Sequence, residues 1–361
     1  MESFFDQPYF RMNKLFMSGL GIWPEQSLFM RCVLPAMCIL FFVSVIIPEV
    51  VLANGVIEVR YSIRTIISFF FSLDMQMRTI LDQIECHWAQ MQKSPNIEIL
   101  RKHGHRAQLV TLAFAIYIYV SSILFLTLPI MPIFLDIVMP LNESRPRDLL
   151  FQAEYRIDHD KYFFEILFHA SVTSMIAMSI IVAVDSMFFT IVEHGCGLFE
   201  IVGTNIKKVN LSIDRSDNDD YKKICYCVDL HKEALRCVIR SAKIVYLIIL
   251  FFSMVLVLNM DNLKDVVRYG TFVIGQMVHV LFNSIYGQKI FDYSLSVPDS
   301  VYGSDWITFS TKNKKLLIAI LIRSQRPCLL TAGKIYILSM ASFSSVMQTA
   351  CSYFTVLTSM V

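Results

Sequence analysis

Long apolar stretches without a charged residue recur along this chain, and polar segments separate them. A helix that crosses the ~30 Å hydrocarbon core of a bilayer needs about 20 mostly apolar residues, and a charged side chain near either end can reach the interface. Six stretches meet this requirement: 32–48, 107–135, 166–184, 244–260, 269–288 and 335–361. The pattern therefore predicts six membrane-spanning helices.

A seventh apolar segment, between Val56 and Leu81, is less clear. Only residues 65–73 are uncharged there, with Arg60 and Arg64 before them and Asp74 and Arg78 after. Its amphipathic pattern favours a membrane helix with one face on protein or water. The alternative is a helix that lies on the membrane interface.

We predict an all-α integral membrane protein in which residues 1–361 form one domain. The seven transmembrane helices are expected at approximately 30–52, 57–81, 107–135, 162–192, 243–261, 268–290 and 335–360.

The distribution of lysine and arginine orients these helices. With a cytoplasmic N-terminus, the segments on the inner side carry 24 Lys and Arg residues and the outer segments carry 8. Cytoplasmic loops hold the excess of positive charge in membrane proteins. The sequence therefore predicts a cytoplasmic N-terminus and an extracellular C-terminus.

Helical periodicity continues beyond the bilayer on the cytoplasmic side. Apolar residues recur at steps of three and four from Ile224 to Val238, leading into the fifth span. The fourth helix is also longer than a bilayer requires. We expect helices to extend into the cytoplasm and pack together there.

Composition agrees with a membrane protein, since 55% of the residues are hydrophobic and only 17% are charged. None of the nine cysteines falls in a segment predicted to be extracellular, so a secreted disulfide framework is not expected.

Enzyme and metal signatures are weak. The chain has no Gly-rich phosphate loop and no H-E-x-x-H. The nearest group of metal ligands is His103 and His105 near Cys86 and His87, and a basic patch facing solvent or lipid is the favoured interpretation. We expect no catalytic residue, cofactor, metal or nucleic acid.

The last helix carries a polar stripe without charge. Ser345, Gln348, Ser352, Thr355 and Ser359 follow one another at three or four residues. Such a face can line water in a pore built from several copies. Alternatively, it can pack against another helix through small and hydroxyl residues. Spacing alone slightly favours this packing interpretation.

A second group, rich in aromatic and hydroxyl residues, lies in the predicted outer halves of helices two, three, four and six. Apolar walls with a few polar groups suit a small apolar ligand, although plain helix packing explains the same composition. The candidate ligand-binding residues are Tyr61, Thr65, Phe69, Ser121, Ser122, Phe125, Phe168, His169, Thr173, Tyr269, Phe272, Val273 and Gln276.

Two N-glycosylation sequons occur, and the charge-derived topology separates them. Asn142 lies in a predicted outer loop and Asn210 in a predicted cytoplasmic one. We expect Asn142 to be the glycosylation site.

The C-terminal part contains three distinctive segments: GQKIFDYSLSVPDSVYGSDW (287–306), RSQRPCLLTAGK (323–334) and SYFTVLTS (352–359). Through these segments the chain resembles the insect odorant receptors. The family pattern has a Gly at the end of the sixth helix, then Ser, Val, Tyr and Trp, matched here by Gly287, Ser294, Val297, Tyr302 and Trp306. Gustatory receptors share the plan, but their terminal signature is absent.

The resemblance implies an odorant-sensing subunit of a ligand-gated, non-selective cation channel, assembled as a heterotetramer with the family's shared coreceptor. It implies a pore lined by the last helix and an apolar gate at Val356 and Met360, with Ser359 and Ser352 beside them. The implied ligand is a small volatile molecule bound in the outer cavity. The expected permeating ions are monovalent cations, with divalent cations left open. The implied location is the plasma membrane of olfactory sensory neurons.

Other functions share parts of this pattern. A gustatory-type channel has the same plan, and a seven-helix receptor coupled to G proteins has the same helix count with the opposite orientation. A secondary transporter usually shows inverted repeats or charged midplane helices. The sequence shows neither feature, although Asp185 and His279 are intramembrane polar groups that a transporter could use.

Overall fold

The computed structural model describes residues 4–359 apart from 53–55, 142–144, 146–148, 151–154, 156, 159–160, 210–216, 257–262 and 333–335. Side chains are not described at 46, 48–52, 56–66, 69, 240–256, 263–273, 351, 353–354 and 356–359. Contacts divide the chain into two compact units, which are described separately. Unit 1 comprises Met1–Thr79, Leu109–Ser186 and Leu247–Gly275, and unit 2 comprises Ile80–Gln108, Met187–Tyr246 and Gln276–Val361.

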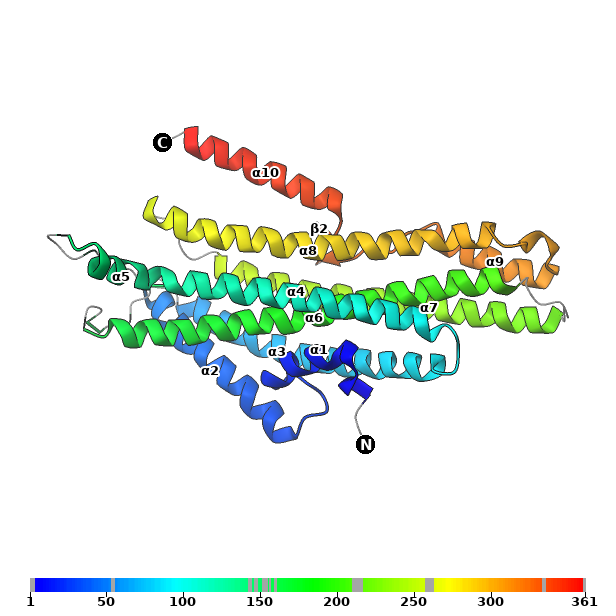
Figure 1. Cartoon of the computed structure of the whole chain (residues 1–361), viewed down its shortest axis with the longest axis horizontal. Helices are drawn as coiled ribbons and strands as arrows, with labels where there is room; N and C mark the ends of the chain where they lie inside the picture. The colour runs from blue at the N-terminus through cyan, green and yellow to red at the C-terminus, as the bar shows by residue number, and fades with distance from the viewer. Residues whose placement is uncertain are drawn as a thin grey trace. The chain divides into compact units, whose positions relative to one another are not determined.

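The elements follow one another as Figure 1 shows. They are η1 (Phe4–Asp6), α1 (Pro8–Gly19), α2 (Leu28–Leu52), α3 (Val56–Met91), α4 (Ile97–Thr127), η2 (Leu128–Ile130), α5 (Met131–Val138), α6 (Phe163–Lys208), α7 (Asp217–Leu256), α8 (Leu263–Tyr302), η4 (Trp306–Thr308), α9 (Thr311–Ser324), β1 (Thr331–Ala332), β2 (Tyr336–Ile337) and α10 (Met340–Ser359).

The all-α fold is confirmed, and six of the seven predicted membrane helices each overlap one helix of the structure. The third, predicted at 107–135, corresponds to the end of α4, η2 and part of α5. Several helices are longer than predicted, because α3, α6, α7 and α8 run on past the apolar stretch with an amphipathic pattern. The last helix begins at Met340, five residues after the predicted start, because Tyr336 and Ile337 pair with β1 instead.

Three helical segments of the described chain are long and apolar enough to cross a membrane by composition alone. They lie at Leu28–Val45, Ile97–Val138 and Phe163–Lys208.

The weakly predicted second helix buries one stripe within unit 1. Phe70 and Leu73 are buried, followed by Met77 one turn later. Asp74 accepts a hydrogen bond from Arg31 of α2 at 2.7 Å, and Arg78 lies 3.4 Å from the same carboxylate. Two of the four charges that weakened the prediction, Asp74 and Arg78, are therefore paired within the protein.

Helix α6 is buried on all sides along its middle, from Ile180 to Phe199. A helix that is apolar all round is typical of the centre of a bundle. The periodic residues of α7 behave as predicted in part, since Ile224, His231 and Val238 are buried while Val228 and Leu235 are half-buried.

Candidate functional site

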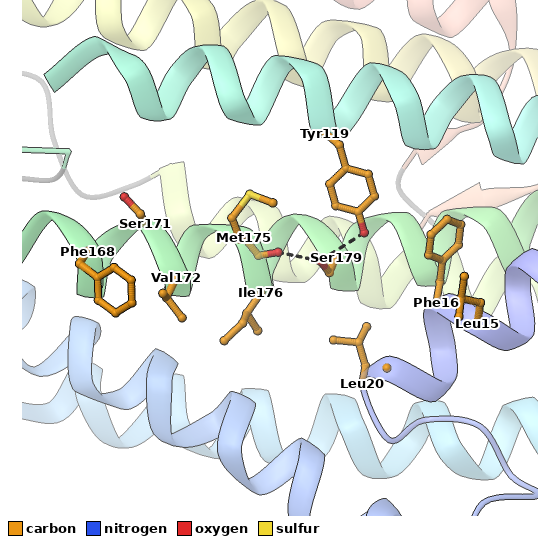
Figure 2. A pocket seen from close by; sticks show the side chains of 11 residues that line it. Leu15, Phe16, Leu20, Tyr119, Phe168, Ser171, Val172, Met175, Ile176 and Ser179 are labelled. Atoms are coloured by element: carbon orange, nitrogen blue, oxygen red, sulfur yellow. Dashed lines mark hydrogen bonds between the residues drawn. The ribbon is translucent and has the colours of Figure 1, made fainter. Parts of the chain in front are cut away.

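A groove in unit 1 runs along one face of α6 (Figure 2). Successive side chains at steps of three and four residues form its floor: Phe168, Ser171, Val172, Met175, Ile176 and Ser179. This spacing is that of one helical face. The groove has a volume of about 500 Å³, within the range of small-molecule sites.

Helices α1 and α4 close the groove at the Ser179 end. Leu15, Phe16, Gly19 and Leu20 approach from the α1 side, and Tyr119 projects from α4 (Figure 2). The rings of Phe16 and Tyr119 lie 6.4 Å apart. The N-terminal helix is therefore part of this site.

The hydroxyl groups of Tyr119 and Ser179 already have partners. Tyr119 donates to Ser179 Oγ at 3.3 Å, and Ser179 donates to the carbonyl of Met175 at 2.8 Å. A hydroxyl has a single hydrogen to donate. This end of the groove therefore offers a ligand an apolar surface to pack against and oxygen atoms that can accept hydrogen bonds.

A hydrogen-bonded relay of three side chains lies in the same unit and joins the outer loop, α6 and α2. Tyr155, in the outer loop, lies 3.3 Å from His169 Nδ1, and His169 Nε2 lies 2.8 Å from Ser44 Oγ of α2. Ser44 donates its own hydrogen to the carbonyl of Phe41. Ser44 must then accept from His169, so the ring carries its hydrogen on Nε2 and accepts from Tyr155 at Nδ1.

An apolar cluster lies beside this relay. Leu150 of the outer loop is buried with Phe163, Leu167 and Ala170 of α6, and Phe125 of α4 packs against them. Leu150 and Tyr155 of this loop are therefore held on the helices by apolar packing and by a hydrogen bond, respectively.

The predicted ligand residues that the structure describes do not share one surface. Phe168 is 72% exposed and lines the groove, whereas His169 lies in the relay and Thr173 donates to the carbonyl of His169. Neighbouring residues point about 100° apart on a helix, which explains the separation. Ser122 is buried and donates to Ile118, and Ser121 and Gln276 are half-buried.

Six further candidates lie outside the described side chains: Tyr61, Thr65, Phe69, Tyr269, Phe272 and Val273. The predicted cavity among helices two, three, four and six thus remains a prediction. Asn142 and Met360 also lie outside the described residues, as do the side chains of Val356 and Ser359.

Sequence reasoning missed most of the groove, which shares only Phe168 with the predicted group. In the sequence, the α6 residues of the groove form a repeat of apolar and hydroxyl residues at helical spacing. The contribution of α1 could not be found by periodicity, because the sequence does not indicate which spans an N-terminal amphipathic helix contacts.

The polar stripe of α10 is exposed in this chain where it is described. Ser345, Gln348, Ser352 and Thr355 are exposed, while Phe343 and Met347 are half-buried. Ser352 donates to the carbonyl of Gln348 at 2.9 Å, and Thr355 donates to that of Ser352 at 2.8 Å. When a hydroxyl donates its hydrogen to a carbonyl of its own helix, its oxygen lone pairs face outward. Such a face suits contact with water and cations.

A buried charge network holds three helices of unit 2 together. His103 of α4 lies between two carboxylates of α6, with Nδ1 2.7 Å from Glu193 and Nε2 3.0 Å from Glu200. Lys289 of α8 also pairs with Glu193, and Lys102 pairs with Glu200. The favoured interpretation of His103 as part of an exposed basic patch was therefore wrong, since only 1% of its side chain is exposed.

Two further histidines pair in the same unit. The rings of His87 of α3 and His194 of α6 are stacked, with His87 Nδ1 3.0 Å from His194 Nε2. Burial lowers the pKa of His87, opposed by the nearby Glu233 carboxylate. Two stacked, buried imidazoles favour the neutral state, because two charges would repel at that distance. Among the described residues no group of three or more His, Cys, Asp or Glu side chains could hold a metal ion.

The residues that carry the family resemblance have packing roles in unit 2. Ser294 is buried, and its Oγ accepts from the backbone N–H of Cys328 at 3.0 Å. Val297 is fully buried. The family pattern predicts that Gly287 ends the sixth helix. In the structure α8 instead continues to Tyr302. Gly287 lies where Leu338, just after β2, crosses the helix.

The intramembrane polar residues are both buried. Asp185 of α6 is fully buried in unit 1, and His279 of α8, in unit 2, accepts at Nε2 a hydrogen bond from the Asn283 Nδ2 group at 3.1 Å. Neither helix is interrupted at these positions, in contrast to the broken helices that mark many transporter sites.

Comparison with known proteins places this architecture in a family. The 7tm odorant receptor family model matches residues 65–351. The insect olfactory receptor OR5 from Machilis hrabei, solved in complex with eugenol, superposes with a TM-score of 0.69 at 14% sequence identity, and the match covers 99% of each chain. A second structure of the same receptor superposes with a TM-score of 0.65 at 14% identity, and the match covers 97% of each chain.

Curated relatives match over shorter stretches. Odorant receptor Or2 of Anopheles gambiae is 23% identical over 141 residues, which cover 36% of this chain and 37% of that protein. Odorant receptor 82a of Drosophila melanogaster is 35% identical over 105 residues, covering 29% of this chain and 27% of that one. The matched stretch therefore spans about a quarter to a third of these relatives. Because the family model covers most of the sequence, this multi-pass membrane protein belongs to the insect odorant receptor family.

Proposed function

We propose that this chain is the odorant-sensing subunit of a ligand-gated, non-selective cation channel that works with the family's coreceptor in a heterotetramer. The observation that carries the proposal is the family match over residues 65–351. In this mechanism an odorant binds the open state more tightly than the closed state and shifts the population toward opening.

The proposed ligand site lies in the outer half of unit 1, among the predicted aromatic and hydroxyl residues. Support comes from the apolar packing around Phe125 and Phe163 and from the relay through His169, which fixes the outer loop beside them. Apolar walls with a few placed polar groups suit a small volatile ligand. The solved relative in complex with eugenol is consistent with such a ligand class.

The proposed pore is lined by α10 from each subunit. The exposed row of Ser345, Gln348, Ser352 and Thr355 supports this role, because the described part of the row presents oxygens rather than charges. A pore without acidic rings should discriminate poorly among monovalent cations.

The decisive experiment expresses the chain with and without the coreceptor and records current while volatiles are applied. Odorant-evoked current that requires this chain and reverses near zero with mixed monovalent cations supports the proposal. A response that needs G proteins, or an epitope at the C-terminus that is stained only after permeabilisation, would replace the channel with a G-protein-coupled receptor. Responses to tastants alone would indicate a gustatory-type channel. Current that requires a counter-transported solute would indicate a transporter.

Wall aromatics are expected to set odorant preference. Replacing Phe168, Tyr269 or Phe272 by Ala removes packing area and enlarges the site, so the ranking of ligands should change. The measurement is a dose–response panel at matched surface expression. Phe71→Ala is a control, because Phe71 is similarly exposed (74%) but lies on α3 outside the candidate group. Three alanine variants with the parent's ranking would contradict the pocket assignment.

The gate is expected to respond to polarity. Val356 and Met360 are four residues apart, a spacing that predicts one face if the last helix extends through residue 360, as the sequence predicts. An apolar constriction closes by excluding water, so Val356→Ser or Met360→Gln should raise the resting current or alter ion permeability. Leu357→Met, about 100° around the helix, should leave permeation unchanged. Cysteines at 356 and 360 that never react with thiol reagents, in either state, would exclude this face from the pore.

Glycosylation tests the orientation. We expect Asn142→Gln to abolish a glycosidase-sensitive shift in gel mobility and Asn210→Gln to leave it intact, because only Asn142 lies in a predicted outer segment. The reverse result would invert the topology.

A further inference from the structure

The groove along α6 has exposed side chains at both ends, and two of the helices that line it are long and apolar enough to cross a membrane. Phe168 at one end is 72% exposed and Leu15 at the other is 67% exposed. Its walls come from the spans Ile97–Val138 and Phe163–Lys208. In a bilayer such a groove opens to lipid rather than to water.

The dimensions of the groove match one leaflet of a bilayer. From Phe168 to Ser179 the α6 stripe rises by about 16 Å at ~1.5 Å per residue. Half of the ~30 Å hydrocarbon core is about 15 Å. A chain lying along the stripe would therefore extend through about one leaflet.

The chemistry of the walls favours a hydrocarbon chain. Val172, Met175 and Ile176 form the middle of the floor (Figure 2). The hydroxyl hydrogens of Tyr119 and Ser179 are used within the protein. A ligand that must accept hydrogen bonds from the groove therefore finds no donor at that end, whereas methylene groups gain packing without loss.

Helix α1 places a cation next to the closed end. Arg11 lies four residues before Leu15, so both are on the same side of α1. Arg11 is exposed, and within the described part of the chain it has no ion-pair partner. The neighbouring Lys14 is engaged by Asp6 at 2.8 Å, with Glu25 at 3.9 Å. An exposed Arg beside an apolar groove complements a phosphate headgroup, which it can bind in a bidentate manner.

We propose that this groove is a binding site for an anionic phospholipid, with one acyl chain along α6 and the headgroup at Arg11. The site ties the N-terminal helix to the spans α4 and α6 through a lipid. The groove shares Phe168 with the proposed odorant residues, so lipid retention and odorant response are scored separately below.

Gly19 offers a clean way to fill the groove. It lines the α1 side, and a Cβ added there meets no atom within 4 Å. Gly19→Leu should therefore occupy the space of the acyl chain without displacing backbone. Gly275→Leu is a matched control, because a Cβ there also meets nothing within 4 Å and Gly275 does not line the groove. Ile176→Trp fills the groove from α6 as a second, independent variant.

The test uses the purified full chain, delipidated and equilibrated with vesicles of phosphatidylcholine containing a minority of phosphatidylserine. Lipid that stays with the repurified protein is counted by mass spectrometry. The wild type should be enriched in phosphatidylserine relative to the vesicles. Gly19→Leu and Ile176→Trp should lower the retained phosphatidylserine about tenfold, the effect of excluding roughly two methylene groups from an apolar site. Gly275→Leu should behave as the wild type.

Arg11→Gln tests the headgroup separately. This variant should retain a similar amount of total phospholipid. The ratio of phosphatidylserine to phosphatidylcholine in the retained lipid should fall to that of the vesicles. The proposal is overturned if the wild type shows no enrichment, if both filling variants retain lipid as the wild type does, or if Arg11→Gln keeps the enrichment. Filling variants that retain lipid but change the odorant response would identify the groove as the odorant site instead.

Discussion

Replacing Glu193 by Gln should destabilise unit 2 by about 3–5 kcal/mol, the usual cost of removing one partner from a buried ion pair. Glu193 is 1% exposed and faces both His103 and Lys289. The substitution keeps the shape of the side chain but leaves the half-buried ammonium group of Lys289 without its buried counter-charge. The measurement is the midpoint of thermal unfolding of the purified chain in detergent, together with surface expression.

Two controls separate this effect from a general loss of charge. Glu98→Gln breaks only an exposed pair with Arg101 and should change stability by about 0–1 kcal/mol. Lys289→Met added to Glu193→Gln removes the stranded Lys289 charge and should recover part of the loss. A Glu193→Gln midpoint equal to that of Glu98→Gln would show that the network does not stabilise the fold.

Gly287→Ala should also impair folding strongly. A Cβ at this position would fall on the carbonyl oxygen of Leu338 and lie 2.6 Å from its Cβ. Leu338 cannot retreat easily, because its N–H donates to the carbonyl of Leu330 at 2.8 Å beside the β1–β2 pair. Forcing extra volume against fixed backbone typically costs ~1–3 kcal/mol and can cost more.

Gly275→Ala is the matched control, since it lies in the same helix and its added Cβ meets nothing within 4 Å. Alanine favours a helix over glycine by roughly 0.5–1 kcal/mol. Gly275→Ala should therefore raise the unfolding midpoint slightly while Gly287→Ala lowers it. Equal midpoints for the two variants would show that the crossing at Leu338 is not tight.

The helix plan was predictable because lipid imposes a local rule. A spanning helix must satisfy its backbone internally and cover itself with apolar side chains, so length and hydropathy reveal it. The same rule could not locate the ends of α6 or α8, because outside the bilayer an amphipathic helix continues wherever another helix covers its apolar side.

Individual sites were predicted less well for the same reason. Phe168 and His169 are adjacent in the sequence, yet one lines a groove and the other joins the outer loop to α2. His103 was interpreted from its basic neighbours, although its partners lie on α6, about ninety residues away.

By itself, the sequence determined that this is a multi-helix membrane protein of a recognisable family, since composition, periodicity and the motif from Gly287 to Phe354 are local properties. Only the tertiary structure decided what those residues contact. It converted Gly287 from a helix end into a crossing point, neutralised Asp74 with Arg31, and brought α1 against Tyr119 to close a groove. Such contacts join residues distant in sequence, and their partners are chosen by packing, which no single segment encodes.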